Sequence, residues 1–224
     1  MQNIEELQEL NYDSYGSLKP TKLVILLHGY GSNGKNMMQI AIKMAQNLPE
    51  TKFIMPNAPL KFEAAPELQD AYQWFSLINR SPESMRAGAS AAHPILTNFI
   101  KTQAVKNNVD IANITLMGFS QGGMMSLYSG LRIQDFVGKI ISCAGAMIAG
   151  EILHNEIAPS CSKSTKVLLA HGSSDTVVPV FATQGAYKLL QSLGVECSIM
   201  IEPGLDHSIN DQIINAAINF CSGQ

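Results

Sequence analysis

The sequence carries little charge and has no run of basic residues. Only 15% of its 224 residues are charged, and 15 scattered lysines and arginines are set against 18 acidic residues, for a formal net charge of −3. Proteins that bind nucleic acid or an anionic membrane surface gather cations on one face to neutralise phosphates. We therefore expect no nucleic acid or anionic membrane surface as a partner.

Cysteine patterns and long apolar runs are also missing. The four cysteines form no C-x-x-C pair and have no metal-ligand spacing, which predicts free buried thiols, no disulfide framework, no metal site and no cofactor: Cys143, Cys161, Cys197 and Cys221. The acidic N-terminal stretch lacks the apolar core of a signal peptide. No segment approaches the roughly 18 to 20 apolar residues of a membrane span. A cytoplasmic protein without integral membrane association is predicted, as a monomer or a homodimer.

Short apolar segments alternate with longer segments of helical periodicity. The apolar segments are uninterrupted, as is typical of strands buried on both faces of a parallel sheet, and lie at 22–27, 52–55, 113–119, 138–144, 166–171 and 196–202. The last residues, from Asn210 to Cys221, read as a closing helix. Strand alternating with helix predicts a doubly wound α/β fold, and residues 1–224 show no linker that would divide them into two domains.

A glycine-rich loop, LLHGYGSNG, follows the first apolar segment and matches the dinucleotide pattern G-x-G-x-x-G at positions 29–34. That reading requires an acidic residue at the end of the second strand, about 20 residues on, to hold a ribose. No acidic residue occurs between Thr51 and Lys61. An NAD(P)-binding oxidoreductase is therefore the less favoured alternative.

The stretch GFSQGG, from Gly118 to Gly123, directly follows a predicted strand and precedes a predicted helix. G-x-S-x-G at such a junction is the nucleophile elbow, in which a strained turn exposes a serine hydroxyl above the sheet. Ser120 is thus a candidate nucleophile. A serine hydroxyl needs a base to take its proton and an acid to orient that base.

Both partners follow Ser120 in the order expected for this kind of fold. Asp175 comes just after the strand at 166–171, and His207 comes just after the strand at 196–202, at the sheet edge where open α/β sheets bind ligands. Singly, each residue has an alternative role in a turn or a helix cap. Asp206 and Asp211 are lower-ranked alternative acids.

A tetrahedral intermediate needs fixed backbone N–H donors for its oxyanion. We expect one from Gln121, the residue after the nucleophile, and the other from Tyr30 in the glycine-rich loop. Four other histidines lack such a context: His28, His93, His154 and His171. For His28 and His171, which lie at strand ends, a structural hydrogen bond is the commoner role.

Several stretches together resemble the phospholipase/carboxylesterase family of α/β-hydrolases, which includes acyl-protein thioesterases. They are LLHGYGSNG, PNAP (56–59), QWF (73–75), GFSQGG, HGSSDTVVP (171–179) and GLDHS (204–208). The resemblance implies a mostly parallel sheet with no large lid domain. It also implies a serine hydrolase that cleaves carboxylic esters, thioesters or lysophospholipids, with Ser120, Asp175 and His207 as triad. Tyr30 and Gln121 match its oxyanion donors, with Tyr30 where the family usually has leucine.

Two departures concern the substrate and leave the hydrolytic residues intact. Thioesterase members often carry an aspartate after the Trp-aromatic pair, whereas Ser76 stands here, and the segment after residue 59 differs from their usual substrate loop. Two roles are open for Trp74 and Phe75: they line an acyl pocket, or they pack beneath the loop. Met124, Met125 and Met147 are candidates for a channel or for the core, and 145–165 is a candidate rim. A hydrolase fold kept only for binding is a further alternative.

Overall fold

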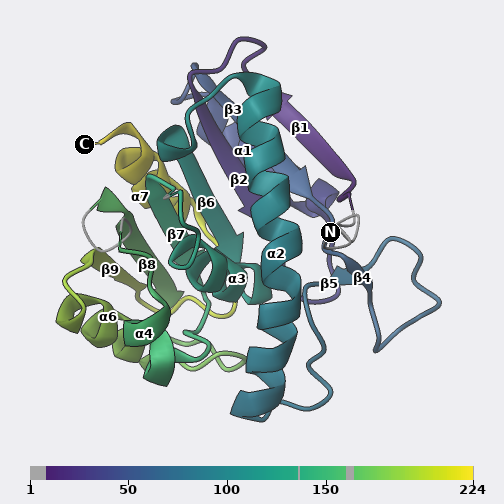
Figure 1. The fold of residues 1–224 in the computed structure, drawn as a ribbon, viewed down its shortest axis with the longest axis vertical. Helices are drawn as coiled ribbons and strands as arrows, with labels where there is room; N and C mark the ends of the chain where they lie inside the picture. The colour runs from purple at the N-terminus through teal and green to yellow at the C-terminus, as the bar shows by residue number, and fades with distance from the viewer. Residues whose placement is uncertain (1–8, 136, 160–163, 224) are drawn as a thin grey trace, which may run out of the picture.

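The computed structural model describes residues 9–135, 137–159 and 164–223. Within them lies a seven-stranded sheet of order β1-β3-β2-β6-β7-β8-β9 (Figure 1). All pairs are parallel except that of β1 (Tyr12–Gly16) with β3 (Thr51–Pro56). The remaining strands are β2 (Lys22–Leu27), β6 (Ile114–Phe119), β7 (Lys139–Cys143), β8 (Lys166–Gly172) and β9 (Glu196–Glu202). The parallel strands confirm the predicted segments to within one residue at either end.

Helices cover both faces of this sheet. On one face pack α2 (Pro82–Asn107), α3 (Gln121–Gly130) and α6 (Phe181–Ser192), and on the other α1 (Met38–Ala45) and α7 (Asp211–Ser222) (Figure 1). The short helix α4 (Leu153–Glu156) lies in the connection between β7 and β8. The doubly wound prediction is confirmed, and no large lid domain is inserted among the described residues.

The two faces explain why the strands are apolar throughout. In β2, Leu23, Ile25 and Leu27 belong to the core beneath α2, α3 and α6, while Val24 and Leu26 belong to the core beneath α1 and α7. Each residue of a strand therefore has a buried partner surface, whichever way it points.

Two features of the sheet were not predicted. Strand β1 has the polar sequence YDSYG and pairs antiparallel with β3 at the sheet edge, where its outward side chains stay in water. Inside the long connection after β3, β4 (Leu60–Lys61) and β5 (Tyr72–Gln73) form a small antiparallel pair. Cys143 and Cys221 are buried free thiols as predicted, whereas Cys197 is a free thiol that is only half-buried. Cys161 lies outside the described residues.

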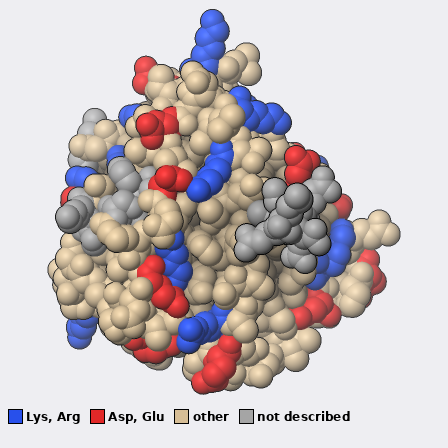
Figure 2. Space-filling model, viewed as in Figure 1, with Lys and Arg blue, Asp and Glu red and all other residues tan. Residues whose placement is uncertain are grey.

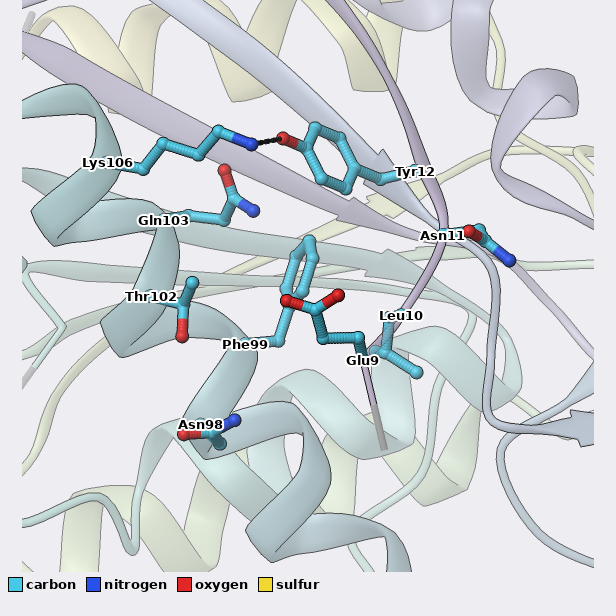
Figure 3. Close-up of a pocket in the computed structure, with 9 residues that line it drawn as sticks. All are labelled: Glu9, Leu10, Asn11, Tyr12, Asn98, Phe99, Thr102, Gln103 and Lys106. Carbon is cyan, nitrogen blue, oxygen red and sulfur yellow. Dashed lines mark hydrogen bonds between the residues drawn. The ribbon is translucent and has the colours of Figure 1, made fainter. Parts of the chain in front are cut away.

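Acidic and basic side chains are interspersed over the face seen in Figure 2. A pocket of about 250 Å³ lies between the start of the described chain and α2, where Nζ of Lys106 donates a 2.7 Å hydrogen bond to Oη of Tyr12 (Figure 3). In the described part of the chain, no helix combines the length and apolar character needed to cross a bilayer.

Candidate active site

Ser120 occupies the sharp turn between β6 and α3. Its backbone has φ 53° and ψ −117°, a strained conformation for a residue with a side chain. The flanking glycines are needed for space: a Cβ on Gly122 would overlap the carbonyl of Leu27, and one on Gly118 would overlap the backbone of Gly122. The turn therefore has the geometry that the G-x-S-x-G pattern predicts.

The imidazole of His207 bridges the other two predicted residues. Its Nε2 lies 2.9 Å from Oγ of Ser120, and its Nδ1 lies 2.6 Å from Oδ2 of Asp175. These contacts join positions 87 and 32 residues apart in sequence. With Nδ1–H donating to the carboxylate, Nε2 is left as an acceptor for the serine proton, so the arrangement is able to convert the hydroxyl into a nucleophile.

Asp175 is held in a fully buried side-chain position. Its Oδ1 accepts hydrogen bonds from the N–H groups of Val177 (2.8 Å) and Val178 (2.9 Å), which leaves Oδ2 to face His207. Burial alone would raise the pKa of Asp175, but the hydrogen bonds from His207, Val178 and Val177 outweigh it and lower that pKa. The carboxylate is thus ionised and correctly aimed.

The two alternative acids are occupied elsewhere. Asp206 accepts a hydrogen bond from the hydroxyl of Ser208 at 2.7 Å, and Asp211 pairs with Lys43 at 2.5 Å. Neither is hydrogen-bonded to the imidazole of His207, so among the described carboxylates Asp175 is the one placed to orient it.

His28 and His171 have structural hydrogen bonds. His28 is buried, with Nδ1 2.8 Å from the carbonyl of Gly29 and Nε2 accepting from the N–H of Ala58 at 3.0 Å; burial lowers its pKa to about 4. Nε2 of His171 lies 2.8 Å from the carbonyl of Val178 and 3.1 Å from Oδ2 of Asp175. His93 packs against Tyr128. No group of three or more acidic, histidine or cysteine side chains in the described ranges is arranged to hold a metal ion.

The two predicted oxyanion donors flank Ser120. The N–H of Gln121 is in the first turn of α3, where no intrahelical acceptor exists. Tyr30 follows Gly29, where an added Cβ would meet Cβ of Ser120 at 3.5 Å, so the two backbones approach closely. We find no hydrogen bond from the N–H of Tyr30 to any other described residue. Both residues thus adjoin the Ser120 turn, and neither backbone N–H donates to another group within the described residues.

An apolar cavity of about 710 Å³ surrounds Ser120 and His207. Its walls come from the loop after β2, from the connection after β3, and from the segments before α6 and α7. The apolar side chains that line it include Met37, Ile40, Leu77, Met85, Met124, Ala146, Val178 and Ile209. Arg80 is the cationic side chain among the lining residues. Such a space fits an apolar group next to Ser120.

Trp74 and Phe75 do not line this cavity. Both side chains are 1% exposed and belong to the core between the sheet and α2. Their own backbones contact the site at the side chain of Gln121: the N–H of Trp74 donates to Oε1 of Gln121 (2.9 Å), and Nε2 of Gln121 donates to the carbonyl of Phe75 (2.8 Å). Of the three candidate methionines, Met124 lines the cavity. Met125 is buried in the core, and Met147 packs against that core. Of the described residues in 145–165, Ala146 lines the cavity.

Sequence reasoning missed Glu63. This half-buried residue of the connection after β3 accepts a hydrogen bond from Oη of Tyr30 at 2.5 Å across 33 positions of sequence. No motif contains it, and its neighbours in LKFEAAPE read as an ordinary loop. The one signal was the tyrosine at position 30, whose hydroxyl requires a partner when it is partly buried.

The comparisons with known proteins agree with this geometry. Residues 14–223 match the model of a family described as Phospholipase/Carboxylesterase. Among curated relatives, an acyl-protein thioesterase 1 of Gibberella zeae is 27% identical over 202 residues, which cover 84% of each chain. A probable carboxylesterase, SOBER1-like, of Arabidopsis thaliana is 28% identical over 201 residues, 84% of this chain and 73% of the relative.

Solved structures are similar over nearly the whole chain. The crystal structure of esterase PE8 is 33% identical, with a TM-score of 0.87, and the match covers 96% of this chain and 99% of that one. The Zea mays acyl-protein thioesterase 2 is 20% identical, with a TM-score of 0.76 and coverage of 95% and 98%, a likeness that supports the fold alone.

Proposed function

Because the chain belongs to the phospholipase/carboxylesterase family and is an esterase-type enzyme, we propose that it hydrolyses carboxylic esters and thioesters through an acyl-enzyme on Ser120. The observation that carries the proposal is the position of His207, within hydrogen-bond distance of both Ser120 and Asp175. This chain supplies nucleophile, base and orienting acid from three separate loops at one edge of the sheet.

In the first half-reaction, Oγ of Ser120 attacks the substrate carbonyl while Nε2 of His207 takes the hydroxyl proton. Asp175 holds the ring and stabilises the imidazolium that forms. The N–H groups of Tyr30 and Gln121 donate to the oxyanion of the tetrahedral intermediate. The intermediate then collapses, and His207 gives its proton to the departing alcohol or thiol.

In the second half-reaction, a water molecule attacks the acyl-enzyme. His207 takes one proton from that water, a second tetrahedral intermediate forms, and its collapse returns the proton to Oγ of Ser120. The carboxylic acid is released and the enzyme is restored.

The cavity favours an apolar acyl group and leaves the leaving group less constrained. Several relatives are named acyl-protein thioesterases, but Ser76 stands where that group often has aspartate, so we propose small esters and thioesters before acyl-proteins.

We also propose a cytoplasmic location, supported by the free thiols of Cys143, Cys197 and Cys221.

A panel of p-nitrophenyl esters of increasing acyl length, extended to matched acyl thioesters, tests the proposal. The wild-type protein is expected to hydrolyse members of both series, and Ser120→Ala to lose at least about 10³-fold in rate on each. Absence of turnover at every chain length would favour a hydrolase fold kept only for binding. Equal rates for the variant would rule out Ser120 as the nucleophile.

A further inference from the structure

Glu63 connects two parts of the cavity wall through a single carboxylate oxygen. Oε1 of Glu63 accepts hydrogen bonds from the hydroxyl of Tyr30 at 2.5 Å and from the N–H of Leu77 at 2.8 Å. Tyr30 and Leu77 both line the cavity that contains Ser120. The backbone N–H of Glu63 is itself anchored by Oε1 of Gln73, a buried residue, at 2.8 Å.

We propose that Glu63 is a positioning residue that, through the phenol of Tyr30, holds the oxyanion-donating N–H of Tyr30 in place. The inference rests on the proposed function, because it assigns a role in stabilising the tetrahedral intermediate. It adds a residue that lies outside every matched motif and a role for the Tyr30 side chain, whereas the oxyanion role uses only its backbone.

The loop that carries Tyr30 is restrained at several points, and the Tyr30 side chain supplies one of them. Tyr30 lies between two glycines, and Gly31 has φ +73°, a backbone conformation that favours glycine. Beyond Gly31 the loop is fixed by backbone hydrogen bonds, from Gly31 to Tyr72 at 2.9 Å and from Tyr72 to Ser32 at 2.8 Å. The peptide that carries the N–H of Tyr30 is also held at its carbonyl, because the Gly29 oxygen accepts from Nδ1 of His28 at 2.8 Å and from the N–H of Ser32 at 3.2 Å. The side chain of Tyr30 adds a restraint on the other side of this peptide.

The side chain of Tyr30 has two kinds of contact. Its ring packs edge-on against Phe62, with centroids 4.9 Å apart and an interplanar angle of 82°. Its hydroxyl reaches past the ring to Glu63. Ring packing tolerates small rotations, whereas the short hydrogen bond fixes one position of the phenol, so the hydroxyl is the more demanding restraint.

The hydrogen bond persists over the working range of a hydrolase. Burial would raise the pKa of Glu63, but hydrogen bonds from Tyr30, Ser76 and Leu77 lower it to about 2. Burial and the adjacent carboxylate raise the pKa of Tyr30 to about 12. Between these values a neutral phenol donates to an ionised carboxylate, the stronger class of hydrogen bond.

The experiment compares Tyr30→Phe, Glu63→Ala and Glu63→Gln with the wild type on p-nitrophenyl butyrate. Tyr30→Phe keeps the backbone N–H and the ring but removes the hydroxyl. We expect kcat to fall about tenfold for Tyr30→Phe and Glu63→Ala, with KM within about twofold, because misplacing an oxyanion donor weakens the transition state alone. Glu63→Gln, which keeps an acceptor oxygen, is expected to retain an intermediate kcat.

Tyr12→Phe is the matched control. It removes a phenol hydroxyl that is bonded to a charged group, Lys106, in the pocket of Figure 3, away from Ser120. Its kcat is expected to equal that of the wild type. A drop in kcat for Tyr12→Phe equal to that of Tyr30→Phe would show a general effect of losing a phenol hydroxyl and would overturn the proposal.

A second readout separates positioning from loss of structure. An alkyl trifluoromethyl ketone mimics the tetrahedral intermediate by adding to a serine, so its inhibition constant should rise by the same factor as kcat falls. Inhibition by the matching primary alcohol, which has no carbonyl group and forms no oxyanion, should not change. An unchanged kcat in Tyr30→Phe and Glu63→Ala overturns this inference while Ser120→Ala is inactive. Full activity in Ser120→Ala overturns the proposed function instead.

Discussion

Nδ1 of His207 lies 2.6 Å from Oδ2 of Asp175, and this contact determines which imidazole nitrogen faces Ser120. Because a carboxylate only accepts hydrogen bonds, it selects the tautomer with the proton on Nδ1 and leaves Nε2 free for the serine proton. An asparagine amide at position 175 is able to donate to Nδ1 instead, which would reverse the tautomer.

Asp175→Asn is therefore expected to lower kcat on an ester substrate by on the order of 10³- to 10⁴-fold with little change in KM. Asp206→Asn is the matched control, since Asp206 adjoins His207 in sequence but bonds to Ser208. Steady-state kinetics of both variants decide the matter. Comparable losses of kcat in the two variants, or a loss in Asp206→Asn alone, would contradict the assignment of the orienting role to Asp175.

Gly122→Ala tests the packing that holds the nucleophile turn. The new methyl group would overlap the Leu27 carbonyl at the end of β2, so we expect a loss of at least about 3 kcal/mol in the free energy of unfolding, or failure to fold. Gly185→Ala is the control: no atom lies within 4 Å of the added Cβ in α6, and it should stabilise the protein by about 0.5–1 kcal/mol. Denaturant titration of both proteins gives the two values, and a neutral Gly122→Ala would contradict the close approach.

His28 predicts a dependence of stability on pH. Burial lowers its folded-state pKa from 6.5 to about 4, so below pH 6.5 the unfolded chain binds the proton more readily than the folded one. Stability that is present above pH 6.5 should therefore decrease as the pH falls to about 4, by about 3 kcal/mol.

Unfolding free energies measured from pH 8 to pH 4 for wild type and His28→Asn check this prediction. The asparagine does not titrate. Between pH 6.5 and 4, unfolding of the variant should therefore take up about one proton fewer than unfolding of the wild type, and its unfolding free energy should depend less steeply on pH. Parallel curves for the two proteins would show that His28 is not responsible.

Acyl-chain selectivity should depend on Ala146. Its small side chain lines the cavity beside Met124 and Val178, so Ala146→Phe would fill part of the 710 Å³ next to Ser120. We expect kcat/KM for octanoyl esters to fall by about tenfold or more, while that for acetyl esters stays within about threefold. Val105→Phe, at an 82% exposed position of α2, is the control and should leave both values unchanged. An equal loss for both chain lengths in Ala146→Phe would place the acyl group elsewhere.

The parallel strands and the order of Ser120, Asp175 and His207 could be predicted because the physical causes are local. A strand covered on both faces must be apolar along its length, and a serine in a tight turn needs small neighbours at Gly118 and Gly122. The carboxyl ends of parallel strands share one edge, so residues after β8 and β9 meet those after β6.

Other features depend on contacts between distant segments. The polar strand β1 has no pattern of its own and is held by its pairing with β3. Trp74 and Phe75 were open between cavity and core, and only the path of the loop places them in the core. The bond of Tyr30 to Glu63 joins two loops, and neither loop alone indicates the other.

Labelling with a fluorophosphonate probe, followed by peptide mapping, tests most directly whether Ser120 is the nucleophile. Attack by an activated serine displaces fluoride and leaves a phosphonyl group on its oxygen. We expect one label per wild-type chain, on the peptide that contains Ser120, and none on Ser120→Ala. Full labelling of Ser120→Ala, or a wild-type label on a different residue, would contradict it.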